Sequence, residues 1–275
     1  MTTCLRGLGG AHLVCVALVA SAFALWATAC TPQPYTVTRE PASLHLVGAD
    51  SCRDTMGQVA EAYEATYPWV TVTYEVLNNA LALDALQEGE ADLALLSWRS
   101  PGAEDWLWTD TIARDGVAVI VHPGSPFSEI SLSELSEIFR GRLQEREGVV
   151  ITVVSREAGS GTRAAFESKV LEGEGTTLNA VVVPSSDAMV EFVASTPSAI
   201  GYVSTRRLDD TVRVLSVEGV EPKERAIATG SYPLWRELRL ASKGEPTGEA
   251  RQFAQWLLRG GGSQGLARGI SAASP

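Results

Sequence analysis

The chain has 275 residues, of which 33 are acidic and 22 are lysine or arginine, so its formal net charge is −11. An acidic chain of this kind is not expected to carry a basic nucleic-acid-binding face. It also repels anions as a whole, so an anionic ligand would have to be held by local donors such as backbone N–H groups and a helix N-terminus.

The N-terminal segment has the pattern of an export signal. Arg6 is followed by an apolar run, Ala11 to Ala29, that contains no acidic residue, lysine or arginine. The run ends in "ATAC", which resembles the lipobox of bacterial lipoproteins, where cleavage leaves the cysteine as an acylated N-terminus; Ala27 stands where leucine is usual. We therefore predict a signal peptide over residues 1–29 and lipidation of Cys30.

Two alternatives for this segment stay open. The apolar run, at about 19 residues, is long enough to span a bilayer uncleaved, and cleavage without lipidation would give a soluble secreted protein. All three possibilities put residues 42 onward outside the cytoplasmic membrane. Residues 30–41 are polar and hold three prolines, which predicts a tether. Cys52 is then alone in the mature chain beyond Cys30, so no internal disulfide is expected.

From residue 42 the sequence alternates short β-branched runs with longer helical patterns, which predicts a mainly parallel sheet with helices on its faces. Strands are predicted at 44–49, 70–76, 91–97, 116–123, 149–154, 180–185, 199–204, 212–217 and 234–242. Helices are predicted at 52–67, 81–90, 131–141, 162–173, 187–196 and 248–260, the third with Ser131 as its N-cap and Gly141 as its stop. This length allows one large domain or two lobes, and two lobes with a cleft suit it.

The loop "SREAGSGTRAAFE", residues 155–167, lies between a predicted strand and a predicted helix and allows three interpretations. A hydrolase nucleophile elbow needs G-x-S-x-G, but both outer glycines are missing around Ser160. Beyond the signal, the chain offers only His45 and His122 as histidine bases, and nothing in their surroundings supports that role. The second interpretation is an ordinary capped strand-to-helix turn. The third is an anion cradle.

The anion cradle has the stronger physical argument, because ligands of open α/β sheets bind at the carboxyl ends of strands. Glycines let the backbone approach an oxyanion, Ser160 and Thr162 add hydroxyl donors, and the first N–H groups of the helix point toward the ligand. Arg156 adds a positive charge with a planar fork that suits tetrahedral oxyanions. The chain has no nucleotide-binding glycine motif and no cluster of His and Cys ligands, so we expect neither a cofactor nor a metal.

The same loop resembles the signature loop of the phosphate-binding proteins that serve phosphate ABC transporters. Further stretches resemble that family in the same order over residues 42–268: "DGVAVIVHPGSP" before "LSELSEIFRG", then "AIGYVS", then "YPLWRELRLASKG" before a C-terminal helix and "GSQG". The resemblance implies the α/β, two-lobed type II periplasmic-binding-protein fold, with a two-stranded hinge and a ligand cleft between the lobes. By that analogy, lobe one holds residues 42–118, lobe two holds 119–203, and residues 204–275 return to lobe one.

The resemblance also implies a set of ligand-binding residues. The Ser-Gly-Thr of the family's ligand loop and its arginine are present, whereas the first loop, normally Gly, small, then Thr or Ser, contains an aspartate. The second loop, usually a Gly-Ser-Gly type turn, has neither glycine nor serine, so Asn78 and Asn79 would have to substitute. A serine follows the third strand, where the family has a serine or an acidic ligand. The implied ligand-binding residues are Ser160, Gly161, Thr162, Arg156, Ser97, Asp50 and Ser51.

These observations predict a membrane-tethered, extracytoplasmic solute-binding lipoprotein that captures inorganic phosphate or a similar oxyanion for the permease subunits of an ABC importer. It would be a monomer without catalytic activity. The alternatives are a binder of another oxyanion such as molybdate or sulfate, a sensor or scaffold whose site no longer binds, and, third, an enzyme.

Asp50 is the unusual residue of this predicted site, because an ionised carboxylate repels an anion. We expect its carboxylate to accept a hydrogen bond from the proton of phosphate, which fully deprotonated sulfate lacks, and so to discriminate between the two anions. The alternative is that Asp50 caps the helix that begins near Cys52.

Overall fold

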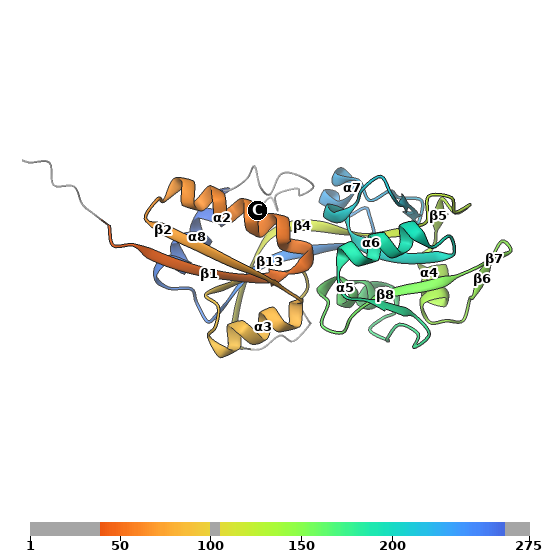
Figure 1. The fold of residues 1–275 in the computed structure, drawn as a ribbon, viewed down its shortest axis with the longest axis horizontal. Helices are drawn as coiled ribbons and strands as arrows, with labels where there is room; N and C mark the ends of the chain where they lie inside the picture. Colours follow the sequence, from red (N-terminus) through yellow and green to blue (C-terminus); the bar gives the residue numbers. More distant parts are fainter. Residues whose placement is uncertain (1–38, 100–104, 262–275) are drawn as a thin grey trace, which may run out of the picture. The chain divides into compact units, whose positions relative to one another are not determined.

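The computed structural model describes residues 39–99 and 105–261 (Figure 1). The chain divides into two units, Met1–Glu40 and Pro41–Pro275, and every described helix and strand lies in the second. The predicted signal peptide, Cys30 and most of the tether lie outside the described residues. In the described ranges, no helix has both the length and the apolar character needed to cross a membrane.

Lobe one is a sheet covered on both faces. β1 (Ala42–Ala49) pairs in parallel with β2 (Val70–Leu77) and β3 (Leu93–Leu96), and β13 (Trp235–Lys243) pairs antiparallel with β3. The alternation of side chains along β1 determines the layers: Leu44 and Leu46 pack with α2 (Arg53–Thr66) and α8 (Gly248–Leu258), and Val47 packs with α3 (Asn79–Glu88). The 3-10 helix η1 (Asp50–Cys52) joins β1 to α2.

Lobe two continues the same sheet with a second set of strands. The order across the sheet is β2-β1-β3-β13-β4-β10-β8-β9, and β11 pairs with β4. The new strands are β4 (Leu107–Val121), β8 (Thr152–Arg156), β9 (Val181–Val183), β10 (Ala199–Ser204) and β11 (Arg213–Val214). Two short pairs lie outside this sheet, β5 (Glu129–Ile130) with β12 (Ser216–Val217) and β6 (Glu145–Arg146) with β7 (Val149–Val150). The helices of this part are α4 (Leu132–Phe139), α5 (Gly161–Val170), α6 (Ser186–Ser195), η2 (Thr205–Arg207) and α7 (Glu224–Thr229).

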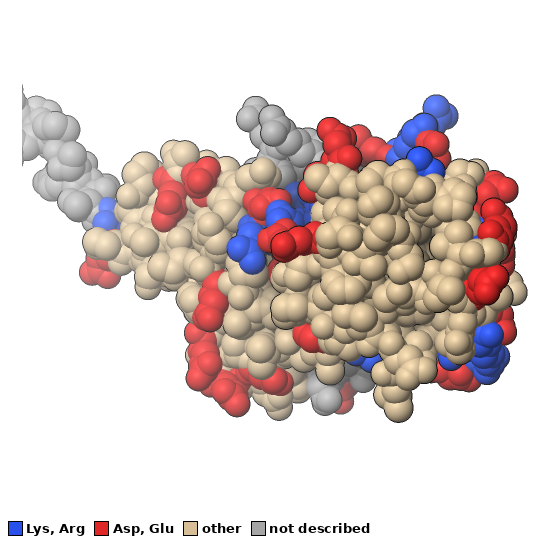
Figure 2. All heavy atoms as spheres, turned by 45° about the vertical axis from the view of Figure 1, so that its right-hand side comes forward, with Lys and Arg blue, Asp and Glu red and all other residues tan. Residues whose placement is uncertain are grey.

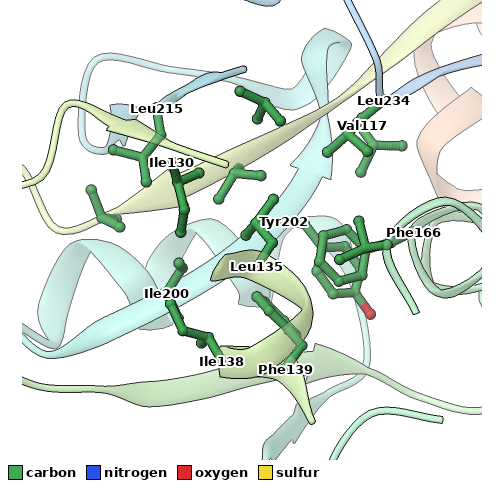
Figure 3. Packing of buried hydrophobic residues seen from close by; sticks show 14 of the residues in the cluster. Val117, Ile130, Leu135, Ile138, Phe139, Phe166, Ile200, Tyr202, Leu215 and Leu234 are labelled. Carbon is green, nitrogen blue, oxygen red and sulfur yellow. The ribbon is translucent and has the colours of Figure 1, made fainter. Parts of the chain in front are cut away.

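The core of lobe two also follows the alternation of a single strand. Val117, Val119 and Val121 of β4 pack with α4 and α5, whereas the intervening residues of β4 pack with α6. An aromatic group fills the first of these layers, where Phe166 of α5 stacks on Tyr202 of β10 with their ring centroids 4.1 Å apart (Figure 3). This stack fixes the middle of α5 against the sheet.

β4 connects the two lobes. Its residues Leu107–Gly116 pair with β13, and Val117–Val121 pair with β10. The sequence predicted only the second part, 116–123, because the first part, "LWTDTIARD", mixes polar and apolar residues on a strand whose exposed positions face away from the core.

Most predicted elements are confirmed within a few residues, and the differences have local causes. The strand predicted at 149–154 divides into β7 and β8, and the one predicted at 212–217 divides into β11 and β12. The helix predicted to reach residue 173 ends at Val170, because Glu172 and Gly173 have positive φ values of 54° and 86°. Ser131 caps α4 in a reciprocal capping box with Glu134, as predicted, and Gly141 has φ +76° just after the helix.

The lobe boundaries at residues 118 and 203 stay a prediction. Strand pairing places β11 against β4, and β12 against β5, before the chain reaches β13.

Charge is distributed as the composition suggests. On the face shown in Figure 2, acidic side chains are spread widely, and lysine and arginine form small groups rather than one broad patch. Attraction of an anion on this face would therefore depend on local groups.

Candidate ligand-binding site

The loop between β8 and α5 presents a helix N-terminus at the end of a strand. Ser160 is the N-cap of α5, and its hydroxyl accepts a hydrogen bond from the Arg163 N–H at 3.3 Å. Gly159 has φ +89°, a left-handed conformation that favours glycine and lets the chain turn before the helix. The first N–H groups of α5 have no partner within the helix, so they can donate to an anion.

The core of lobe two holds the start of this loop. The hydroxyls of Ser155 and Tyr202 are 2.8 Å apart, and the Arg156 N–H donates to the Tyr202 hydroxyl at 3.3 Å. Burial raises the pKa of Tyr202 to about 12, so the phenol stays neutral. Because Tyr202 also stacks on Phe166 of α5, both ends of the loop are attached to packed side chains.

Lobe one packs directly against the loop. A Cβ atom added to Gly161 would lie 2.3 Å from Ser97 Oγ and 2.8 Å from Asn79 Oδ1, which is closer than real contacts allow. The N–H of Ala80 also donates to the carbonyl of Gly159 at 3.1 Å. In this structure, the close approach of the two lobes therefore leaves room only for glycine at residue 161.

Three hydroxyls on the lobe-one side have no partner. The Oγ atoms of Ser51 and Ser97 and the Oγ1 of Thr55 are buried, and none has a hydrogen-bond partner among the described residues. An unpaired buried hydroxyl is costly, and a ligand oxygen or ordered water that accepts from it removes that cost. Ser51 and Ser97 were both expected to bind ligand, and these orphaned donors fit an oxyanion.

Arg156 is buried and already paired. Its Nε and Nη2 donate to the two carboxylate oxygens of Glu157 at 2.8 and 3.0 Å, and its Nη1 lies 3.2 Å from Asp50 Oδ2 and 3.1 Å from the Ser186 hydroxyl. Burial would lower the pKa of Arg156, but Asp50 and Glu157 together raise it. The guanidinium is thus fixed in orientation, and its charge is matched by carboxylates.

Asp50 points across to lobe two. Its Oδ2 accepts a hydrogen bond from the Ser186 N–H, at the N-terminus of α6, at 2.8 Å. Burial would raise the pKa of Asp50, but Arg156 and Ser186 outweigh it, so the pKa is lowered and the carboxylate is ionised at neutral pH. The interpretation of Asp50 as the cap of its own helix is wrong, because α2 has Cys52 as its N-cap residue and no side-chain cap.

Thr162 belongs to a buried network that sequence analysis missed. Its hydroxyl accepts from Arg236 Nη1 at 3.0 Å, and Arg236 donates from Nε and Nη2 to Asp115 Oδ2 at 2.9 and 2.7 Å. Asp115 also accepts from the hydroxyls of Ser204 and Thr205. The sequence does contain a signal for this network: Arg236 and Asp115 are charged residues in or next to runs that otherwise have the pattern of buried strands.

Asn78 and Asn79 both form hydrogen bonds with the backbone of lobe one. Asn78 caps α3 by accepting from the Leu81 N–H at 2.9 Å. Asn79 Oδ1 accepts from the N–H groups of Ser97 and Trp98, and its Nδ2 donates to the Trp98 carbonyl at 3.1 Å. Asn79 therefore fixes the backbone of the loop that carries Ser97, and its substitution for the family's glycine-rich turn stays a prediction.

The chain is similar to proteins of one family along most of its length. Residues 35–260 match the family model described as PBP superfamily domain. The phosphate-binding protein PstS of Bacillus subtilis (strain 168) is 30% identical over 225 residues, which are 78% of this chain and 75% of that protein.

Two solved structures are similar to this chain at more than a quarter identity. One, from Clostridium perfringens, is described as a phosphate ABC transporter substrate-binding protein with bound phosphate, and it matches with a TM-score of 0.78 and 27% identity over 84% of this chain and 100% of that chain. The other, an ABC-type phosphate transport receptor from Vibrio cholerae, matches with a TM-score of 0.71 and 26% identity over the same shares.

Proposed function

Because this chain belongs to the PBP superfamily, we propose that it is an extracytoplasmic substrate-binding protein that captures inorganic phosphate and delivers it to an ABC permease. Its relatives are phosphate-binding proteins, and one of the similar structures contains phosphate. The type II periplasmic-binding-protein fold gives the mechanism, in which two lobes close on a ligand. Such a protein binds and releases its ligand and catalyses nothing.

The observation that carries this proposal is the arrangement around the N-terminus of α5. The Ser160-Gly161-Thr162 turn faces the unpartnered hydroxyl of Ser97 across a contact so close that only glycine fits at residue 161. Donors from both lobes thus converge without acceptors of their own, as binding of an oxyanion requires.

We extend this proposal to the residues of the cleft and to the N-terminal segment. Asp50 and Arg156 belong to the binding site as a pair that orders the cleft, and lobe one comprises residues 42–118 with the C-terminal part of the chain. Residues 1–29 act as a signal peptide, Cys30 carries the lipid that anchors the protein outside the cytoplasmic membrane, and the protein acts as a monomer without a cofactor or metal.

Titration of the purified full-length protein tests the ligand. The melting temperature should rise with phosphate and much less with sulfate or molybdate, since a ligand at 100 times its Kd stabilises the folded state by about 2.7 kcal/mol. A rise with sulfate or molybdate alone would assign a different oxyanion. No rise with any of the three would favour a sensor or scaffold whose site no longer binds.

A further inference from the structure

Arg206 stands out because its charge has no partner. Its Nε and Nη1 atoms are buried, and neither forms a hydrogen bond within the described part of the chain. No carboxylate of the described residues forms an ion pair with it, although Asp187 and Glu191 line the same hollow on lobe two. Arg206 as a whole is half-buried, but nitrogen atoms that are themselves buried normally form hydrogen bonds, so these two unpartnered atoms call for an explanation.

Two sets of contacts fix where Arg206 lies. On one side of it, Ser204 and Thr205 donate to Asp115, which is bound to Arg236 and through it to Thr162 of the ligand loop. On the other side, Arg207 pairs with Asp54 in the first turn of α2 at 2.8 Å and with Asp187 in the first turn of α6.

These ties place η2 where the ligand loop and the N-termini of α2 and α6 meet. The electrostatics agree, because burial raises the pKa of the Cys52 thiol to about 12 while the nearby charges of Arg236 and Arg206 oppose that rise. Arg206 is therefore close to η1, the turn that carries Ser51.

The other arginines around the cleft are already neutralised. Arg156 is matched by Asp50 and Glu157, and Arg236 is matched by Asp115. The neighbouring Arg207 has two carboxylate partners of its own. Arg206 differs from Arg156, Arg236 and Arg207 because no carboxylate of the described residues forms an ion pair with it, in a chain whose formal net charge is −11.

Side-chain hydroxyls without hydrogen-bond partners form a second set of donors, on η1 and α2 of lobe one. Ser51 and Thr55 are on η1 and the first turn of α2, and their hydroxyls are buried without partners in the described ranges. Gln58 Oε1, further along α2, is also unpartnered, and as an acceptor it suits a water or the proton of an anion. Hydroxyl donors and a guanidinium without acceptors, gathered beside the ligand loop, are a set that an anion would satisfy.

We propose that Arg206 is an anion-binding residue of this site, and that its guanidinium supplies the positive charge that the other arginines of the cleft share with carboxylates. This inference rests on the proposed function and adds to it a residue outside the ligand loops that the sequence indicated. It explains how an acidic chain with Asp50 in its cleft holds an anion.

The variant Arg206→Gln tests this role by calorimetric titration of the full-length protein with inorganic phosphate. The Kd should rise about 10- to 100-fold, the effect of losing one charge-assisted hydrogen bond. The loss should shrink as ionic strength rises, since salt screens a charge effect. Arg142→Gln is the matched control, because it makes the same change of charge at an exposed arginine paired with Glu137, and its Kd should stay unchanged.

A merely structural role would give a different melting behaviour. Removal of an unpaired buried charge should leave the ligand-free protein as stable as the wild type or more stable. A structural arginine would instead lower the melting temperature without phosphate. If Arg206→Gln does not fold, Arg206→Lys decides, because it keeps the charge but loses the planar fork and should still weaken binding.

The outcomes separate this inference from the proposed function. Wild type that binds phosphate, together with an Arg206 variant of equal Kd, overturns the role of Arg206 and leaves the function intact. Wild type that does not bind phosphate overturns both.

Discussion

Gly161, Asp50 and Arg156 show how single residues at this site are determined by what lies opposite them. Gly161 has no room for a side chain because Ser97 and Asn79 lie against it. Asp50 and Arg156 come from different lobes and meet at the N-terminus of α6. Each of these residues therefore belongs to the contact between the lobes. Substitutions there should disturb that contact more than the packing of either lobe's core.

Gly161→Val should weaken phosphate binding about 10- to 100-fold, because an overpacked contact costs about 1–3 kcal/mol and this one opposes closure of the lobes. Titration calorimetry measures the change, and circular dichroism checks that the fold persists. Gly175→Val is the control, since a Cβ there would meet nothing within 4 Å. Equal affinity of wild type and Gly161→Val would show that the lobes need not approach this closely.

Asp50→Asn should lower the free energy of unfolding by about 1–3 kcal/mol at pH 7, the range for hydrogen bonds to charged groups. The pKa of Asp50 is lowered in the folded protein, so this stability is present above the unfolded pKa and is lost as the pH falls through the folded one. Urea denaturation of both proteins should therefore differ at pH 7 and converge in acid. If the difference in free energy of unfolding between wild type and Asp50→Asn persists at low pH, the ionised carboxylate is not the group that stabilises the fold.

The same variant tests whether Asp50 discriminates between anions. If the carboxylate accepts a hydrogen bond from the proton of phosphate, Asp50→Asn should narrow the preference for phosphate over sulfate. Calorimetry with both anions gives the ratio. An unchanged ratio would limit Asp50 to its contacts with Arg156 and Ser186.

At the scale of elements, β4 and β13 connect the two lobes, and they also hold the loop between β8 and α5 in place. Asp115 of β4 and Arg236 of β13 are both buried, with side-chain exposures of 0% and 1%, and Arg236 reaches Thr162 at the start of α5. The N-terminus of α5 is thus fixed to the strands that connect the lobes, so a change in those strands would be transmitted to the ligand loop.

Arg236→Met should destabilise the fold by about 3–5 kcal/mol, because it leaves Asp115 as an uncompensated buried charge. Arg239→Met on the same strand should cost less than about 1 kcal/mol, since Arg239 is partly exposed and its pair with Glu237 is a surface ion pair. Urea unfolding of the two variants gives the comparison. Similar losses for both would show that the buried network contributes little.

At the scale of the whole molecule, a two-lobed binding unit follows an N-terminal segment that has the features of an export signal. The apolar run and Cys30 lie outside the described residues, so the anchor rests on sequence alone. The function proposed for residues 41–275 requires a position outside the cytoplasmic membrane, and all three interpretations of the N-terminus provide it.

Cys30→Ala should release the protein from membranes or leave it unprocessed, because no other cysteine follows the apolar run closely enough to take the lipid. Membrane fractionation and the apparent mass of the product measure this. Cys52→Ala is the comparison, since Cys52 is fully buried in the fold and should not affect the membrane fraction. Unchanged fractionation and processing of Cys30→Ala would identify the apolar run as the anchor.

The sequence by itself determined the fold class and the family, and it predicted the loop at residues 155–167 as ligand-binding. Hydrophobic periodicity is local, so it located most of the longer helices and strands but not α7, β5, β6 or the first part of β4. The Ser160-Gly161-Thr162 turn could be identified because capping and glycine conformation depend on neighbouring residues. The resemblance to phosphate-binding proteins is confirmed by the family match and by the solved structures, and so is the two-lobed α/β fold.

Only the tertiary structure decided which distant residues meet. The contacts of Asp50 with Arg156 and of Asp115 with Arg236 join segments that are more than a hundred residues apart in the chain. The lack of partners at Arg206 Nε and Nη1 likewise depends on how distant segments pack. No local pattern encodes such a contact, because a charged residue at the end of a strand looks the same in sequence whether it is solvated, paired or left open for a ligand. Burial and partners decide among these states, and both arise only when the chain has folded.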